Sequence, residues 1–307
     1  RQMCIRDSVW LDALTNYNTA LGFDGESGGE QYHKYWPADV HVIGKDIIRF
    51  HTLYWPIFLM ALGEPLPKQI FGHPWLLFGS DKMSKSKGNV IYADDLIRRF
   101  GLDGVRYYLL SEMPYQNDGT ITYENFIARY NTDLANTLGN LVSRTVAMTK
   151  KYFDGVIPSP AGDEGPDAEL KAAAADAYAN FTANMDTFRA ADALDAVFTL
   201  LRRANKYIDE TAPWALAKDE AQRARLGTVL YNLLESLRIA AILLRPAIPD
   251  SAEKILAAIG SPDDRFESAA AFGITRPGNT VGEQSVLFAR LDEMKTLAEL
   301  NAEKAEA

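Results

Sequence analysis

The sequence predicts an α/β segment followed by an all-α segment. In the first segment, residues 40–43 form a short apolar run typical of a buried strand, a helical pattern extends from Asp46 to Gly63, and residues 69–72 form a second strand-like run. In the second segment, residues 122–260 are strand-poor, and apolar residues recur three and four apart. A strand, a helix and another strand in this order are typical of a parallel, Rossmann-type nucleotide-binding sheet, whose ligands bind at the carboxyl ends of the strands. The later pattern predicts a bundle of four or five helices.

The elements between these two segments are predicted from turn and capping residues. A hairpin is expected after His73, which comes directly after the second strand. Asp94 is expected to cap a helix over residues 95–100 that ends at Gly101, because a carboxylate can accept a bond from the first free N–H groups of a helix. Another helix is expected over residues 103–110.

The bundle is expected to begin with one long helix. Thr122 and Asn125 form its predicted start, and Gly155 marks its predicted end. The Arg245-Pro246 pair and Pro249 break the later pattern. Further helices are expected over residues 167–185, 191–208 and 220–244.

Composition limits the class of protein. With 307 residues the chain can form two domains, and 47% hydrophobic with 24% charged residues is typical of an ordinary globular protein. The sequence has no uninterrupted apolar run of the roughly 18 residues that a membrane span needs, so we predict a cytoplasmic location and no membrane partner. The lone Cys4 cannot form an internal disulfide or a cysteine-based zinc site, and no metal site is expected in this chain.

The net charge of −9 argues at first against a nucleic-acid partner, because phosphate contacts supply much of the affinity in such complexes. However, basic residues gather in the middle of the chain, where a local basic face can coexist with an acidic total. These residues are Arg129, Arg144, Lys150, Lys151, Arg202, Arg203 and Lys206.

The most informative segment is the lysine loop, residues 81–89, with the sequence Asp-Lys-Met-Ser-Lys-Ser-Lys-Gly-Asn. Lysine ammonium groups, serine hydroxyls and a glycine that lets backbone N–H groups come close are well suited to bind a polyphosphate. The alternative is a solvated basic turn, which is what most short lysine runs are. We predict that Lys82 and Lys85 are catalytic, with the larger effect at Lys85.

The lysine loop resembles the second signature of the class I aminoacyl-tRNA synthetases. Residues 9–17 and 41–56 resemble the methionyl-tRNA synthetase family in particular, and residues 140–144 and 212–214 resemble the segments with which that family reads the CAU anticodon. The resemblance implies activation of L-methionine by ATP with Mg²⁺, followed by transfer to tRNA(Met), including the initiator tRNA. A relative that charges cysteine, leucine, isoleucine or valine is less favoured, because the aromatic and anticodon residues match methionine.

The resemblance also implies roles for individual residues. The ATP and adenylate site would contain Gly44, Lys45, Asp46, His73, Met83, Ser84 and Ser86; the methionine pocket Trp10, Tyr17, Ile47, His51 and Trp55; and the anticodon surface Asn140, Arg144, Pro213 and Trp214. Ile47, His51 and Trp55 are four apart and share one helix face. Leu14 is a departure, since some family members have proline there.

Simpler explanations exist for each of these groups. Asp46 would in that case only cap its helix, and the aromatic and aliphatic residues would be ordinary core. Asn140 and Arg144 would be solvated surface, and Trp214 would be a packing anchor. Only the resemblance favours the functional interpretation.

The expected domains are a non-native N-terminus at 1–8, the C-terminal half of a Rossmann catalytic domain at 9–75, a lysine-loop and stem-contact region at 76–121, a helical anticodon-binding domain at 122–260 and a tail at 261–307. The four histidines contain no His-Ile-Gly-His type element, which class I synthetases need for ATP. We therefore expect a C-terminal part that is inactive alone, with any zinc site in the missing N-terminal half. The alternative is a non-catalytic tRNA-binding module that uses only the helical bundle.

Overall fold

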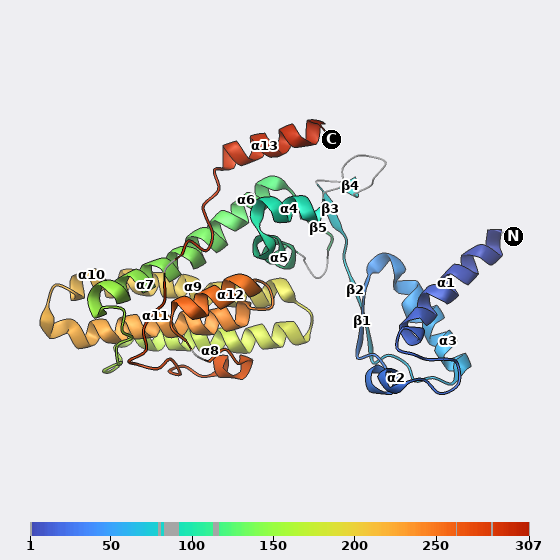
Figure 1. Cartoon of the computed structure of the whole chain (residues 1–307), viewed down its shortest axis with the longest axis horizontal. Helices are drawn as coiled ribbons and strands as arrows, with labels where there is room; N and C mark the ends of the chain where they lie inside the picture. The colour runs from blue at the N-terminus through green and yellow to red at the C-terminus, as the bar shows by residue number, and fades with distance from the viewer. Residues whose placement is uncertain are drawn as a thin grey trace. The chain divides into compact units, whose positions relative to one another are not determined.

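The computed structural model describes residues 2–78, 81–82, 92–112, 117–261, 263–283 and 285–306. These residues divide into two compact units, which are shown together in Figure 1. Unit 1 contains the described residues up to Trp75 together with 117–118, and unit 2 contains the remaining described residues.

Unit 1 is built around two parallel strands. β1 (Val40–Gly44) pairs with β2 (Gln69–His73), and Gly44 at the end of β1 lies opposite His73 at the end of β2. This pairing confirms the two predicted strands and their parallel direction. Two helices that the sequence pattern did not predict precede them, α1 (Gln2–Thr19) and α2 (Glu30–Tyr35).

The helical segment after β1 is not a uniform α-helix. It begins as a 3₁₀ turn (η1, Lys45–Ile47), contains a π-helical turn (η2, Phe50–Tyr54) and ends as α3 (Trp55–Leu62), with Gly63 in the left-handed conformation at φ 76°. The predicted end at Gly63 is confirmed, because glycine adopts this conformation without steric cost. Wider π turns inside helices are frequent at functional sites.

Unit 1 has its own small hydrophobic core. It is made of Leu14, Tyr32, Trp36, Trp55 and Leu59, so α1, α2 and α3 all contribute. Trp55 and Leu59 are completely buried.

Unit 2 begins with a three-stranded sheet. β3 (Leu76–Phe78) and β4 (Asp81–Lys82) are antiparallel, which confirms the predicted hairpin, and β5 (Gly119–Ile121) pairs with β3 in parallel. β5 has only three residues, too few for an alternating pattern to be recognised in the sequence.

The two helices that follow are α4 (Ala93–Phe100) and α5 (Leu102–Ser111). The prediction that Asp94 caps the first of them was wrong, because Tyr92 is at the capping position. Asp94 lies in the first turn, where its negative charge interacts favourably with the positive end of the helix dipole. Gly101 ends α4 as predicted, with φ 75°. Asp103 lies inside α5 and accepts a bond of 2.6 Å from the N–H of Ser251 at the start of another helix.

The long helix predicted from Thr122 consists of three consecutive parts. The Thr122 hydroxyl accepts a bond of 3.1 Å from the N–H of Asn125, which confirms the predicted cap. α6 (Tyr123–Arg129) is followed by a π-helical segment (η4, Tyr130–Gly139) and α7 (Asn140–Phe153), which ends next to Gly155.

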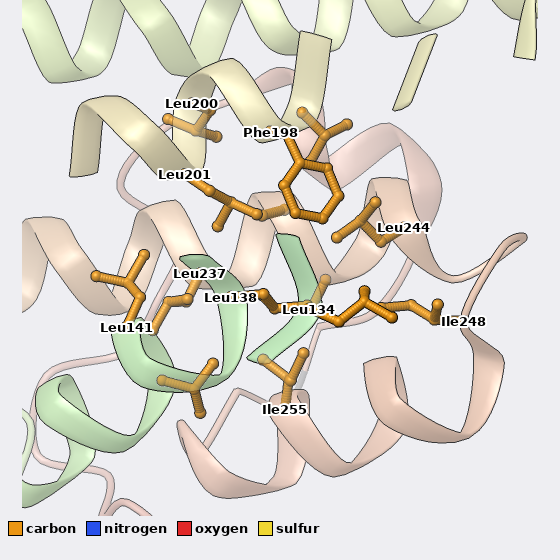
Figure 2. Packing of buried hydrophobic residues seen from close by; sticks show 14 of the residues in the cluster. Leu134, Leu138, Leu141, Phe198, Leu200, Leu201, Leu237, Leu244, Ile248 and Ile255 are labelled. Atoms are coloured by element: carbon orange, nitrogen blue, oxygen red, sulfur yellow. The ribbon is translucent and has the colours of Figure 1, made fainter. Parts of the chain in front are cut away.

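The bundle packs around α11 (Arg223–Leu244), in which every residue from Leu226 to Leu244 is buried. The other described helices of this region are α8 (Gly165–Asp186), α9 (Ala190–Thr211), α10 (Pro213–Leu216), η5 (Glu220–Gln222) and α12 (Pro249–Ala258). Figure 2 shows leucine, isoleucine and phenylalanine side chains from η4, α7, α9, α11 and α12 meeting in this core. This arrangement confirms the predicted order of an α/β segment and then an all-α segment.

One described helical stretch, Glu220–Leu244, is long and apolar enough to cross a membrane, and its most apolar window is 100% buried inside the bundle. Packing of the bundle therefore accounts for its composition.

The tail after the bundle is also packed against it. It contains η6 (Phe266–Ala270) and α13 (Glu293–Glu306), and Thr280 forms an antiparallel bridge with Val156. The side-chain amide of Asn131 in η4 both donates to and accepts from the backbone of Leu291, at 3.0 and 2.8 Å.

Candidate functional site

The carboxyl ends of β1 and β2 bring together three predicted adenylate-site residues of unit 1. The Asp46 carboxylate lies close to the backbone of Gly44. A Cβ added to Gly44 would be only 2.6 Å from Asp46 Oδ1 and 4.0 Å from His73 Cε1. Glycine is therefore the residue that lets the carboxylate lie here. η1 has no side-chain cap, so the simple explanation that Asp46 caps its helix was wrong.

Lys45 is held by a residue that the sequence analysis did not identify. Its Nζ lies 2.5 Å from Asp118 Oδ1 and 4.5 Å from the ring centroid of Trp75. Asp118 also accepts a bond of 2.9 Å from the N–H of Trp75, and the bonds from Lys45 and from this N–H lower the pKa of its carboxyl. The Lys45 ammonium is therefore kept at one place beside the carboxyl ends of the strands.

Four of the five residues predicted for the methionine pocket form a connected cluster in unit 1. The Tyr17 hydroxyl lies 3.0 Å from His51 Nε2, and His51 Nδ1 lies 3.1 Å from the carbonyl oxygen of Ile47. Since a carbonyl only accepts, His51 Nδ1 carries the proton, and in the neutral ring Nε2 accepts from Tyr17. Burial raises the pKa of Tyr17, which keeps its phenol protonated and able to donate.

Trp55 is the fourth member of this cluster. Its ring centroid is 6.0 Å from that of Tyr17, and its Nε1 donates to His41 Nε2 at 3.3 Å. The fifth predicted residue, Trp10, is in another arrangement: its ring stacks on Phe50, with centroids 3.6 Å apart and planes at 7°. His41 was interpreted from the sequence only as a strand residue.

The lysine loop is largely outside the described residues. Lys82 lies in β4, where its backbone pairs with Leu77. Met83, Ser84, Lys85 and Ser86 lie outside the described residues. Elsewhere in the described part of the chain, no group of three or more His, Cys, Asp or Glu residues is placed to hold a metal ion.

The predicted anticodon residues lie on the bundle of unit 2. Asn140 is the first residue of α7, directly after the π-helical segment, and its side chain is exposed. Arg144 is partly exposed, and its Nη2 lies 4.0 Å from Asp209 Oδ1. Pro213 is buried at the first turn of α10, whereas Trp214 is 46% exposed. About half of the Trp214 side chain is therefore open to solvent.

A surface pocket of about 230 Å³ adjoins Asn140. Asn136 and Ser143 from the helices line it, together with Phe288 and Arg290 from the tail. The sequence analysis did not identify this pocket, because its lining residues Asn140 and Arg290 are about 150 positions apart in the sequence and no local pattern links them.

Comparison with known proteins identifies both segments. A family model described as class I tRNA synthetases (M) matches residues 8–146, and one described as the anticodon binding domain of methionyl tRNA ligase matches residues 159–302. The methionine–tRNA ligase of Clostridium acetobutylicum is 54% identical over 298 residues, which are 97% of this chain and 46% of that protein. The Bacillus subtilis enzyme is 50% identical over 294 residues.

The solved structures agree with these sequence matches. Mycobacterium tuberculosis methionyl-tRNA synthetase in complex with methionyl-adenylate superposes with a TM-score of 0.86 at 44% identity, over 92% of this chain and 56% of that one. The chain thus spans about half the length of the curated relatives it matches.

Proposed function

Because the chain belongs to the methionyl-tRNA synthetase family, as its motifs predicted, we propose that it is part of a methionine–tRNA ligase. The enzyme would join L-methionine to tRNA(Met) at the expense of ATP. The observation that carries this proposal is that two domains of one family match this chain in order, one over the two sheets and the first helices of the bundle, and one over the rest of the bundle and the tail.

In the first step the methionine carboxylate attacks the α-phosphorus of ATP, and pyrophosphate leaves. Gly44, Lys45, Asp46 and His73 would line the adenylate site, with Lys45 kept in place by Asp118. Lys82 and Lys85 would stabilise the negative charge that grows on the phosphates, assisted by Met83, Ser84 and Ser86 of the lysine loop and by the Mg²⁺ that accompanies ATP.

In the methionine pocket, Tyr17 and His51, which are bonded to each other, would place polar atoms near the thioether, and Ile47, Trp55 and Trp10 would supply apolar walls. Such a pocket suits methionine because sulfur is polarisable and packs well against aromatic rings.

On the bundle, Asn140 and Arg144 would bond to base edges, and the exposed Trp214, placed by Pro213, would stack on an unpaired base of the CAU anticodon. The initiator tRNA would be read in the same way. We further propose the domain bounds 9–75, 76–121, 122–260 and 261–307, and a cytoplasmic location, as suits a translation enzyme.

The proposal is tested in two parts. The chain, mixed with a labelled RNA hairpin carrying the tRNA(Met) anticodon stem and loop, should bind it at least tenfold tighter than a hairpin with a changed anticodon, as measured by fluorescence anisotropy. The intact enzyme should catalyse methionine-dependent ATP–pyrophosphate exchange. Anticodon-specific binding by the chain, combined with no exchange by the intact protein, would instead favour a non-catalytic tRNA-binding module.

A further inference from the structure

His41 lies at the centre of the residues proposed to bind methionine, although no role has been given to it. It is on β1 and only 6% exposed. Its ring centroid is 4.5 Å from Tyr17 and 6.0 Å from His51, and its Nε2 receives the bond from Trp55. Three of the five proposed pocket residues therefore surround one buried imidazole.

The direction of the bond between Trp55 and His41 is fixed by chemistry. An indole nitrogen only donates, so His41 Nε2 must be unprotonated and its proton must be on Nδ1. Burial, and secondarily the nearby His51, lower the pKa of His41 and keep the ring neutral. His41 can therefore accept this bond throughout the neutral pH range.

Trp55 depends on this acceptor because its side chain is completely buried. A buried N–H without an acceptor costs free energy in the folded protein. A turn or shift of the ring that brings the N–H to another acceptor is then favoured. A turn of the Trp55 ring would also move the wall against which Tyr17 packs, since the two ring centroids are only 6.0 Å apart.

We propose that His41 is a positioning residue of the methionine pocket, which fixes the indole of Trp55 and thereby sets the shape of the space for the thioether. This inference rests on the proposed function. His41 itself does not touch the substrate; it acts through Trp55 and Tyr17.

Two substitutions distinguish the role of His41 as an acceptor for Trp55 from its role in filling space. His41→Leu keeps an apolar side chain of moderate size but removes the acceptor, whereas His41→Gln can place an amide oxygen near the former Nε2. In methionine-dependent exchange by the intact enzyme, His41→Leu should raise KM for methionine on the order of tenfold with kcat changed less than about twofold, and His41→Gln should restore KM to within about threefold. His33→Leu, at an exposed histidine of α2, is the matched control and should leave KM unchanged.

A double-mutant cycle identifies the partner. Trp55→Phe removes the indole N–H, so His41→Leu should have little further effect in that background. An equal effect of His41→Leu with and without the indole, or an unchanged KM in the single variant, would overturn the inference. If the unmodified enzyme itself shows no methionine-dependent exchange, the proposed function fails instead.

A measurement on the unmodified chain covers the case in which His41→Leu does not fold. In ¹⁵N-resolved NMR at pH 7, His41 should be the Nδ1–H tautomer, and the Trp55 Nε1–H should exchange with solvent at least 100-fold more slowly than that of the exposed Trp214. A proton on His41 Nε2 would exclude the bond and overturn the inference.

Discussion

Replacing Glu235 with glutamine should strongly destabilise unit 2. Glu235 and Arg238 lie one turn apart on α11, and both side chains are 0% exposed. The carboxylate accepts bonds from the Arg238 guanidinium, the shortest 2.7 Å, and from three consecutive backbone N–H groups of the tail at Gly273, Ile274 and Thr275, at 2.9–3.0 Å. Arg238 in turn donates to Ser268 and to the carbonyl oxygen of Ala271.

The expected magnitude follows from this arrangement. Glutamine has the same shape but no charge, and its NH₂ group cannot accept the bonds that the second carboxylate oxygen accepts. Arg238 would then be a buried cation without a counter-charge. Breaking a buried pair in this way costs about 3–5 kcal/mol, so the free energy of unfolding, measured by urea titration of the chain at pH 7, should fall by that amount.

The effect should also depend on pH. Burial alone would raise the pKa of Glu235, but the bonds and charge of Arg238 and the tail N–H groups outweigh burial, so the net pKa in the folded protein is lowered. A lowered carboxyl pKa adds stability above the unfolded pKa of about 4.3, and this stability is lost as the pH falls through the folded pKa. The difference between the parent and Glu235→Gln should therefore be constant from about pH 7 to pH 5 and shrink below about pH 4.

A matched control is Glu253→Gln, because the side chain of Glu253 is 66% exposed and its nearest contact with Arg245 is 3.3 Å. Exposed pairs of this kind contribute about 0–1 kcal/mol. If Glu235→Gln lost no more stability than Glu253→Gln at pH 7, the account of the buried pair would be refuted.

Three other predictions concern the loop, the anticodon surface and a helix cap. In the intact enzyme, Lys85→Ala should lower the rate of ATP–pyrophosphate exchange by roughly 10²-fold, because a preorganised positive charge is lost; an unchanged rate would remove its catalytic assignment. Trp214→Ala should weaken aminoacylation of tRNA(Met) with little effect on exchange, since the indole is exposed on the bundle; equal losses in both assays would indicate misfolding. Thr122→Ala should lower the free energy of unfolding by about 1 kcal/mol in urea titration and Thr122→Ser by much less, because only the hydroxyl accepts from the Asn125 N–H; equal losses would exclude the cap.

Local patterns predicted most of the elements. The apolar run at 40–43 is sufficient to predict β1, and the glycine at 63 is sufficient to predict the end of α3, because strands and helix ends depend on residues that are close in the sequence. The π-helical segments were not predicted, since residues spaced four apart share a face in an α-helix and nothing in the spacing marks one extra residue in a turn. The misplaced cap at Asp94 has a similar cause: two adjacent acidic residues suit both the cap and the first turn.

The site residues were predictable only where a motif carried them. Gly44, Asp46 and His73 meet because parallel strands end at one edge, as the order of elements predicted. Asp118 could not be found in this way, because it is 73 residues from Lys45 and an isolated aspartate carries no pattern. The same is true of His41, whose role depends on a ring 14 residues away.

The Asn131 amide, which binds Leu291 at both its N–H and its carbonyl, joins the tail to the bundle beside the proposed anticodon surface. The tail residues that line the pocket beside Asn140 come just before Leu291, so they are synthesised long after the helical residues that line the same pocket. A polypeptide halted near residue 280 on the ribosome would already contain α7 through α12. It would lack the tail residues that line the pocket in the finished chain. The proposed anticodon surface would thus be among the last parts of the bundle to be completed during translation.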